Sequence, residues 1–343
     1  MWTLGFVGFG NVGQGLARIL LEKKETLRRR FGFDCSVVFA ATGANEVVCD
    51  PAGLDLAALL DEMDRKGHLR EHPRRSGKSV IECLRTCGAD IVAEITPTNL
   101  ETGEPGLTHI REALTAGSHV VTTNKGPLSV ALKELETLAA EKGVRFRYEG
   151  TVLSGTPVIN LAREALAGCD VLGVAGIVNG TTNFILTRME EGMDYGEALA
   201  EAQKLGYAEA DPTADVEGWD AAVKISLLAS LLMETPLPVT EVERRGISGV
   251  TADQVKKALA AGKRIKLLGE LTRDGGVLKG RVSPRELPGN HPLAGVAGAT
   301  NALTLTTDNM GDVTIVGPGA GRTETGQALL TDILAIARES ARP

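Results

Sequence analysis

The sequence predicts an α/β protein whose first part is a doubly wound parallel sheet and whose second part is an α+β domain. Two observations carry this prediction. Strand-like and helix-like segments alternate from residue 1 to about residue 149, as they do in parallel sheets with crossover helices. Beyond residue 150, glycine-rich turns and short β-branched runs replace that alternation. A length of 343 residues suits two or three modules better than one core.

The elements of the first part follow from apolar periodicity. A segment over residues 11–30 and another over 128–142 keep apolar side chains at the spacing of one buried helix face, so both fit as crossovers between strands. Predicted strands cover residues 4–7, 36–41, 91–94, 119–122 and 144–148.

The second part combines helices with antiparallel strands. We predict helices over about 159–166 and 219–233, and the latter is apolar almost all round, which predicts burial. Predicted strands cover residues 171–178, 267–272, 280–282, 303–307 and 313–316. A last helix over about 325–338 is expected to pack back on the first domain. The expected domains are therefore residues 1–149 with 322–343, and residues 150–321.

Composition excludes several classes of partner. The net charge of −7 argues against a nucleic-acid partner, because such proteins neutralise phosphates with clustered Lys and Arg. Five cysteines, at positions 35, 49, 83, 87 and 169, form no C-x-x-C pair and no His-paired metal spacing, so we interpret them as reduced structural thiols. The most apolar run, residues 225–233, is too short to cross a bilayer, and no basic leader opens the chain. We expect a cytoplasmic protein without a membrane partner.

A glycine-rich turn at Gly8 to Gly13 fits the pattern G-x-G-x-x-G. It follows an apolar strand and opens an amphipathic helix, the context in which a Rossmann-like domain binds pyrophosphate at a helix N-terminus. A structural tight turn is the alternative. The second strand ends at Thr42 to Asn45 without an acidic residue for a ribose hydroxyl, so we expect use of both NAD and NADP or a preference for NADP. A second turn, Gly317 to Gly321, is either a tight connection or a cofactor contact.

The strongest candidates for chemistry are two lysines. Asp220 and Lys224 lie four residues apart and therefore share one face of the predicted buried helix, where a surface ion pair is the alternative. Burial lowers the pKa of a lysine toward the range useful for proton transfer, and Asp220 would oppose that shift. Lys125 directly follows a strand, at the sheet edge where α/β proteins bind ligands, although its surroundings are also ordinary turn composition. The carboxylate-rich loop at 206–215 suits a substrate ammonium group better than a metal ion.

These residues together resemble the homoserine dehydrogenase family along essentially the whole chain. The segments that carry the resemblance are Gly8 to Gly13, Thr96 to Asn99, Thr123 to Lys125, Gly176 to Asn183, Gly206 to Pro212, and Asp220 with Lys224. The resemblance implies reversible NAD(P)-dependent interconversion of L-homoserine and L-aspartate 4-semialdehyde, in threonine and methionine biosynthesis. The rivals are a dehydrogenase of another small amino acid or semialdehyde and a non-catalytic NAD-binding sensor.

The resemblance also implies roles for individual residues. Glu209 and Asp220 would hold the substrate amino and hydroxyl groups, and Lys224 would donate or accept the proton. Lys125 would contact the substrate or share the proton transfer, so the choice between the lysines stays open. The implied cofactor contacts are Phe9, Gly10, Asn11, Val12, Gly13, Thr96, Thr123, Lys125, Gly206 and Gly321.

A monovalent cation, commonly Na⁺, is a further implication of the resemblance. The matching ligands are Glu149, Val152, Ser154 and Thr156, largely through backbone oxygens. Gly150, Leu153 and Ser154 depart from the usual family pattern. The chain resembles short forms that carry neither an aspartate-kinase module nor a C-terminal regulatory domain. A homodimer or higher homo-oligomer is implied, with residues 281–314 building a shared sheet.

Overall fold

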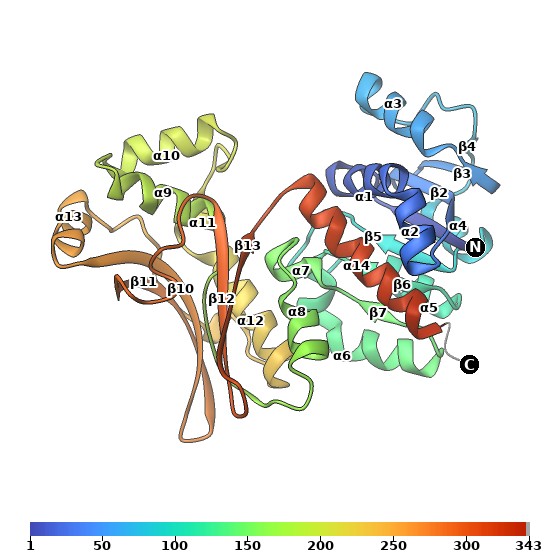
Figure 1. Cartoon of the computed structure of the whole chain (residues 1–343). Coiled ribbons are helices and arrows are strands. Elements are labelled where there is room, and N and C mark those ends of the chain that lie inside the picture. Colours follow the sequence, from blue (N-terminus) through green and yellow to red (C-terminus); the bar gives the residue numbers. More distant parts are fainter. Residues whose placement is uncertain (341–343) are drawn as a thin grey trace. The chain divides into compact units, whose positions relative to one another are not determined.

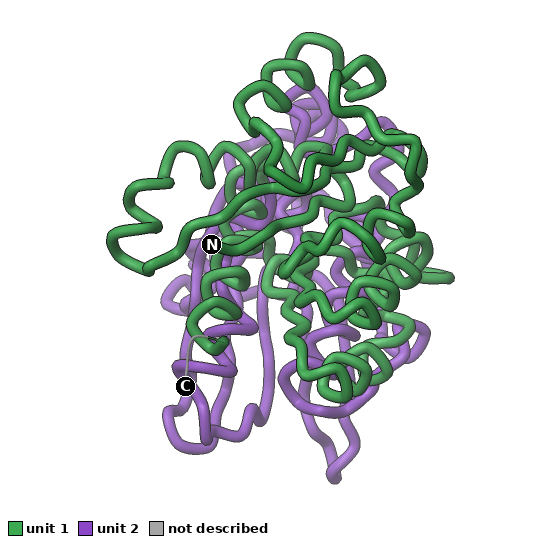
Figure 2. The backbone as a smooth tube through the Cα atoms, turned by 90° about the vertical axis from the view of Figure 1, so that its right-hand side faces the viewer, with its two compact units in different colours: residues 1–155, 321–343 green, residues 156–320 purple. Residues whose placement is uncertain are grey.

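The computed structural model describes residues 1–340, which divide into two compact units (Figure 2). Unit 1 consists of Met1–Gly155 and the C-terminal segment that begins at Gly321, and unit 2 is Thr156–Ala320. Unit 1 therefore contains both the first and the last residues that the structure describes. The α/β fold class predicted from the sequence is confirmed: a mainly parallel sheet lies in unit 1 and a second sheet in unit 2 (Figure 1).

Unit 1 contains a seven-stranded sheet in the order β4-β3-β2-β1-β5-β6-β7. Its strands are β1 (Trp2–Val7), β2 (Cys35–Gly43), β3 (Glu46–Leu54), β4 (Arg75–Ser76), β5 (Ile91–Glu94), β6 (His119–Thr122) and β7 (Phe146–Arg147). The five strands from β2 to β7 are parallel, and their places agree with the prediction. The antiparallel strands β3 and β4 were not predicted, because Pro51 and Gly53 interrupt the β-branched pattern of β3.

The helices of unit 1 flank this sheet. They are α1 (Asn11–Glu22), α2 (Lys24–Phe31), α3 (Leu56–Lys66), α4 (Val80–Thr86), α5 (Gly106–Thr115), α6 (Lys125–Glu141), α7 (Gly150–Leu153) and α14 (Arg322–Ser340). The single helix predicted over 11–30 was wrong in one respect, because the chain leaves helical geometry at Lys23 and forms α1 and α2. Helix α6 begins three residues before the prediction, where the Asn124 side chain caps its first turn.

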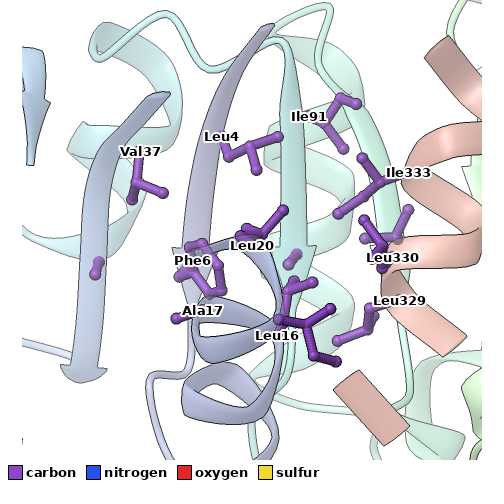
Figure 3. Close-up of a cluster of buried hydrophobic side chains, with 14 of the residues drawn as sticks. Leu4, Phe6, Leu16, Ala17, Leu20, Val37, Ile91, Leu329, Leu330 and Ile333 are labelled. Atoms are coloured by element: carbon purple, nitrogen blue, oxygen red, sulfur yellow. The ribbon is translucent and has the colours of Figure 1, made fainter. Parts of the chain in front are cut away.

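The core of unit 1 joins the first strand to the last helix. Apolar side chains from β1, α1 and α14, among them Phe6, Leu16 and Leu330, form one buried cluster (Figure 3). Glycines allow the two helices to approach closely: a Cβ at Gly15 would lie 2.1 Å from the Arg322 carbonyl oxygen, and one at Gly326 would lie 2.6 Å from the Leu16 nitrogen. Helix α14 is thereby held against the helix that follows the glycine-rich turn.

Unit 2 contains a six-stranded sheet in the order β13-β12-β8-β10-β11-β9. Its strands are β8 (Val171–Ile177), β9 (Glu243–Arg244), β10 (Lys263–Asp274), β11 (Val277–Pro288), β12 (Thr300–Thr307) and β13 (Gly311–Pro318). The long strands pair antiparallel as predicted, and β10 with β11 extends over twelve residues each. Only β9 runs parallel to its neighbour.

The principal helices of unit 2 are α9 (Gly180–Glu190), α10 (Tyr195–Lys204), α11 (Thr213–Val216), α12 (Trp219–Met233) and α13 (Ala252–Ala260). Helix α12 has the predicted bounds and packs on β10, where a Cβ at Gly269 would lie 2.5 Å from Ile225 Cδ1. The helix predicted over 159–166 is instead α8 (Val158–Asn160) followed by a π-helical turn at Leu161–Ala165. Among residues 1–340, no helix has the length and apolarity that a membrane span requires.

Candidate active site

The glycine-rich turn of unit 1 is built for close approach of backbone and ligand. Gly8 has a φ of +105°, and a Cβ there would lie 2.5 Å from the Ile95 carbonyl oxygen. A Cβ at Gly13 would lie 2.5 Å from the Gly8 oxygen, so only glycine allows α1 to start this close to β1. A Cβ at Gly10, the residue that precedes α1, would meet nothing within 4 Å. The turn thus presents an open, exposed helix N-terminus, which fits a pyrophosphate.

The other residues expected at the cofactor divide between the two units. In unit 1, Phe9 and Gly13 are buried, Val12, Thr96, Thr123 and Lys125 are half-buried, and Gly10, Asn11 and Gly321 are exposed. Gly206 lies in unit 2, exposed in the loop after α10. The Gly317 to Gly321 turn straddles the boundary of the units, with Gly321 at a φ of +137°.

A buried carboxylate organises the strand ends of unit 1. Glu94, which is 0% exposed, accepts hydrogen bonds from the Thr96 backbone nitrogen at 3.0 Å and from the Thr96 hydroxyl. Its second carboxylate oxygen lies 3.1 Å from the Thr122 hydroxyl on the next strand. Glu94 therefore positions both loops that carry predicted cofactor contacts. Sequence analysis missed this residue, because one glutamate at a strand end has no distinguishing pattern.

A second residue that the sequence did not single out is Arg322, the first residue of α14. Its guanidinium donates a hydrogen bond of 2.8 Å to the Asn11 side-chain oxygen, at the start of α1. An exposed positive charge therefore stands at the glycine-rich turn. Its sequence signal was weak, since the only clue was the Gly321 turn directly before it.

The hairpin between β2 and β3 carries a carboxylate that changes the expectation for cofactor choice. The Thr42 hydroxyl donates to Glu46 Oε2 at 3.0 Å, and Arg70 Nε contacts Glu46 Oε1 at 2.6 Å. The hydrogen bond from Arg70 lowers the pKa of the Glu46 carboxyl, so that it is ionised at neutral pH. The premise that this tip lacks an acidic group was wrong: Glu46 follows the tip in sequence and returns to it through the antiparallel strand β3.

Lys224 lies at the centre of the polar cluster of unit 2. The residue is 7% exposed, and its Nζ donates to the Val178 carbonyl oxygen at 2.8 Å and pairs with Asp220 at 2.7 Å. The burial predicted from the apolar helix is therefore present. The alternative of a solvated surface ion pair does not describe this lysine.

Two further side chains complete this cluster. Asn179 caps α9 and donates from Nδ2 to Asp220 at 3.1 Å and to Asp215 at 2.6 Å. In the sequence, Asp215 is one of several acidic residues in the 206–215 loop, and Asn179 is one residue of the segment Gly176 to Asn183. Neither was predicted as a site residue. Glu209 is different: its side chain is exposed, and its backbone oxygen accepts a hydrogen bond from the Gln203 side chain. The structure thus gathers Asp220, Lys224 and Asp215, while Glu209 lies apart on the preceding loop.

The predicted cation ligands lie in a buried stretch of chain. Glu149, Val152 and Ser154 belong to unit 1 and are each less than 10% exposed. Val152 lies in the short helix α7, and Glu149 and Ser154 flank that helix. Thr156, also buried, is the first residue of unit 2 and donates from its hydroxyl to the Pro318 oxygen at 3.0 Å. The predicted ligand atoms are all oxygens, and one of them belongs to a carboxylate. This chemistry fits a hard cation.

Comparison with known proteins identifies the family. A model of the homoserine dehydrogenase NAD-binding domain matches residues 8–149, and a model of homoserine dehydrogenase matches residues 157–334. The chain belongs to the homoserine dehydrogenase family. An NAD(+)-dependent homoserine dehydrogenase of Pseudomonas canavaninivorans is 45% identical over 99% of this chain and 97% of its own. The homoserine dehydrogenase of Methanocaldococcus jannaschii is 42% identical over 96% and 97%.

Solved structures of homoserine dehydrogenases have the same fold. A putative homoserine dehydrogenase from Archaeoglobus fulgidus superposes with a TM-score of 0.88 at 38% identity, covering 98% of this chain and 99% of the other. A hyperthermophilic archaeal homoserine dehydrogenase in complex with NADPH has a TM-score of 0.83 at 30% identity, covering 98% of both chains. The chain is accordingly an NAD(P)-dependent oxidoreductase that interconverts L-homoserine and L-aspartate 4-semialdehyde.

Proposed function

We propose that Lys224 handles the proton of the homoserine hydroxyl, with Asp220 positioning it. A bound nicotinamide would accept the hydride that leaves the substrate carbon in oxidation and would return it in reduction. In the direction of aldehyde reduction, the Lys224 ammonium donates a proton to the carbonyl oxygen, and in the oxidative direction the lysine amine takes that proton back. Each turn of the oxidative reaction thus releases one hydride to the cofactor and one proton to the protein.

The observation that carries this proposal is the geometry at Lys224 Nζ. An ammonium has three donors, and two of them face the Val178 carbonyl and Asp220. The third donor is available to a substrate oxygen. Because the surrounding helix is apolar, the two protein acceptors hold the nitrogen in one place and compensate for its burial.

The carboxylates of the 206–215 loop suit the ammonium group at the other end of the substrate. We propose that Glu209, on the exposed loop, binds the substrate ammonium, and that Asp220 also contacts the substrate hydroxyl. Asn179 would act as a positioning residue, because it holds Asp220 and Asp215 through one amide. Lys125, at the first turn of α6, would contact the substrate or share the proton transfer.

Cofactor binding is proposed for unit 1, with phosphates at Gly10 to Gly13 and the nicotinamide half near Thr96, Thr123 and Lys125. Phe9, Gly206 and Gly321 complete the proposed set. We infer that the ionised Glu46 favours NAD by repelling a 2'-phosphate at the hairpin tip. The NAD(+)-dependent name of the Pseudomonas canavaninivorans relative agrees with this inference.

Further proposals concern the wider organisation of the enzyme. Residues 1–149 with 322–343 would form the dinucleotide-binding domain, and residues 150–321 the substrate-binding and dimerisation domain. Glu149 and backbone oxygens of Val152, Ser154 and Thr156 would hold Na⁺. The enzyme would work in the cytoplasm, in threonine and methionine biosynthesis.

The test begins with initial rates of nicotinamide reduction by L-homoserine, measured with NAD⁺ and NADP⁺ and with and without Na⁺. Lys224→Met should lower kcat by about 10²- to 10⁴-fold, the usual contribution of a general acid or base, while NADH still binds with the wild-type Kd. Lys204→Met, at an exposed lysine that ends α10, is the matched control and should keep wild-type kcat. Near-normal turnover of Lys224→Met would move the proton transfer to Lys125.

A substrate panel addresses the rival functions. Turnover of another small hydroxy amino acid at a higher kcat/KM than L-homoserine would indicate a different dehydrogenase. Cofactor binding without turnover of any member of the panel would indicate a sensor.

A further inference from the structure

Three cysteines converge in unit 1, away from the glycine-rich turn. Cys49 lies on β3, Cys83 in α4, and Cys87 directly after α4. The three Sγ atoms all lie within 4.8 Å of one another, and Cys49 and Cys87 are 3.0 Å apart. Spacing in the sequence did not reveal this cluster, because Cys83 and Cys87 are four residues apart and Cys49 lies on a strand more than thirty residues earlier.

The spacing of the sulfurs suits a metal ion bound by all three. With Zn–S bonds of about 2.3 Å, three thiolates around one ion lie about 3.8 to 4.0 Å apart in tetrahedral or trigonal geometry. The cluster needs only small side-chain rotations to reach that arrangement. A disulfide would instead require the 3.0 Å pair to close to about 2.05 Å and would leave the third thiol unused.

The surroundings of the cluster determine how an ion would reach it and which charge lies beside it. Cys83 is fully buried, Cys87 is 8% exposed and Cys49 is half-buried, so a ligand would enter from the Cys49 side and be shielded behind it. Lys78 supplies a compensating positive charge, and its Nζ is held by the Thr86 hydroxyl at 3.0 Å, next to Cys87 in the chain.

We propose that Cys49, Cys83 and Cys87 form a binding site for a thiophilic divalent cation, for which Zn²⁺ is the probe. On binding, three S–H bonds give way to three metal–sulfur bonds, three protons pass to solvent, and a water or small anion takes the fourth position. Thiolate ligands select this class of ion over Mg²⁺ or Ca²⁺. The bound ion would cross-link β3 to α4.

The cross-link has a consequence for the cofactor hairpin. The Val80 nitrogen at the start of α4 donates to the Ala44 oxygen in the turn between β2 and β3, at 3.3 Å. An ion that joins α4 to β3 would therefore hold both the turn and the strand that carries Glu46. Metal binding is expected to stabilise unit 1 even in the absence of substrate.

The experiment uses reduced full-length protein and Zn²⁺ in competition with a chromophoric chelator, together with Co²⁺ spectra. We expect one equivalent of Zn²⁺ per chain, an intense sulfur-to-Co²⁺ charge-transfer band, and a Kd at least a hundredfold weaker in Cys83→Ser and in Cys49→Ser. Cys35→Ser and Cys169→Ser are matched controls, because each removes a partly exposed thiol outside the cluster, and both should bind as the wild type does.

Several outcomes would overturn the proposal. Equal affinity in Cys83→Ser, Cys49→Ser and the controls would place the ion elsewhere. Absence of the charge-transfer band would exclude thiolate ligands. Peptide mapping that finds a Cys49–Cys87 disulfide in the purified protein, with no Zn²⁺ uptake after reduction, would assign the cluster to redox chemistry. Circular dichroism and NADH binding show that each variant is folded, and Cys49→Ser, at the half-buried position, keeps the test valid if Cys83→Ser unfolds.

Discussion

Buried charged residues show how differently single residues can be recognised. Lys224 stands out in the sequence because it is an ionic side chain on a helix that is otherwise apolar, and such a residue must have partners when it is buried. Glu94 is buried more completely, yet nothing around it in the sequence marks it. Its importance comes from hydrogen bonds to Thr96 and Thr122, which only the pairing of β5 with β6 brings within reach.

Cofactor choice gives a prediction at the scale of one residue. Wild-type enzyme should prefer NAD⁺ in kcat/KM, and Glu46→Gln should shift the NADP⁺/NAD⁺ ratio toward NADP⁺ by about five- to tenfold, roughly 1 to 1.4 kcal/mol for one charge near the solvent. The substitution removes the negative charge at the tip and also releases Arg70, which is available to a 2'-phosphate.

The measurement is kcat/KM for both cofactors at low and high salt, because an electrostatic effect weakens as salt increases. Glu71→Gln, at an exposed carboxylate on the same unit, is the control. A wild-type preference for NADP⁺ would restore the expectation drawn from the sequence and would contradict a role for Glu46.

At the scale of elements, unit 1 depends on the close contact of α1 and α14, whose residues are more than 300 positions apart. Gly15→Ala tests that contact. Helix propensity alone predicts a gain of up to about 1 kcal/mol, but a Cβ 2.1 Å from the Arg322 oxygen predicts a loss of about 1 to 3 kcal/mol.

The sign of the change in the free energy of unfolding, measured by urea titration, decides between the two expectations. Gly196→Ala in α10 is the control, because that glycine is exposed and a Cβ there meets only the Asp194 side chain, at 3.4 Å. It should be neutral or stabilising. Stabilisation by both substitutions would mean that α14 does not pack against α1 as described.

Strand β6 adds a dependence on pH. Burial, and secondarily the Arg145 charge, lower the pKa of His119 below 6.5, and its Nδ1 accepts a hydrogen bond from the Arg145 nitrogen at 2.9 Å. Since the unfolded state then binds the proton more readily, stability is full above pH 6.5 and declines as the pH falls from 6.5 toward the folded pKa.

The check is the urea midpoint between pH 7.5 and about pH 5 for wild type and His119→Asn, whose side-chain oxygen keeps an acceptor without titrating. The variant should lose part of the wild-type decline over this range. Parallel curves for the two proteins would show that His119 does not contribute.

At the scale of the whole molecule, the chain is expected to associate with a second copy of itself. The resemblance to homoserine dehydrogenases predicts a homodimer in which the sheet of unit 2 is shared. Size-exclusion chromatography with light scattering should therefore give at least twice the chain mass of 36.0 kDa at micromolar concentration. A constant mass of 36.0 kDa across the concentration range would contradict the shared sheet.

The sequence by itself determined the features that depend on neighbouring residues. The periodicity of α12, the glycine turn between β1 and α1, and the alternation of strands and helices in unit 1 are all local, because burial of one face repeats at the period of the element. Local pattern also located Lys224 and Asp220 on one face. The break at Lys23 and the π-helical turn after Asn160 escaped it, because both keep helical composition.

The tertiary structure alone decided which distant residues meet. Glu46 reaches Thr42 because β3 turns back antiparallel, and Arg322 reaches Asn11 because α14 returns to unit 1. The three thiols converge because the fold brings Cys49 of β3 to the end of α4. Each of these contacts joins two segments, and the apolar periodicity of each segment gives no sign of the other. Sequence periodicity records which face of an element is buried, but it carries no information on which other element covers that face.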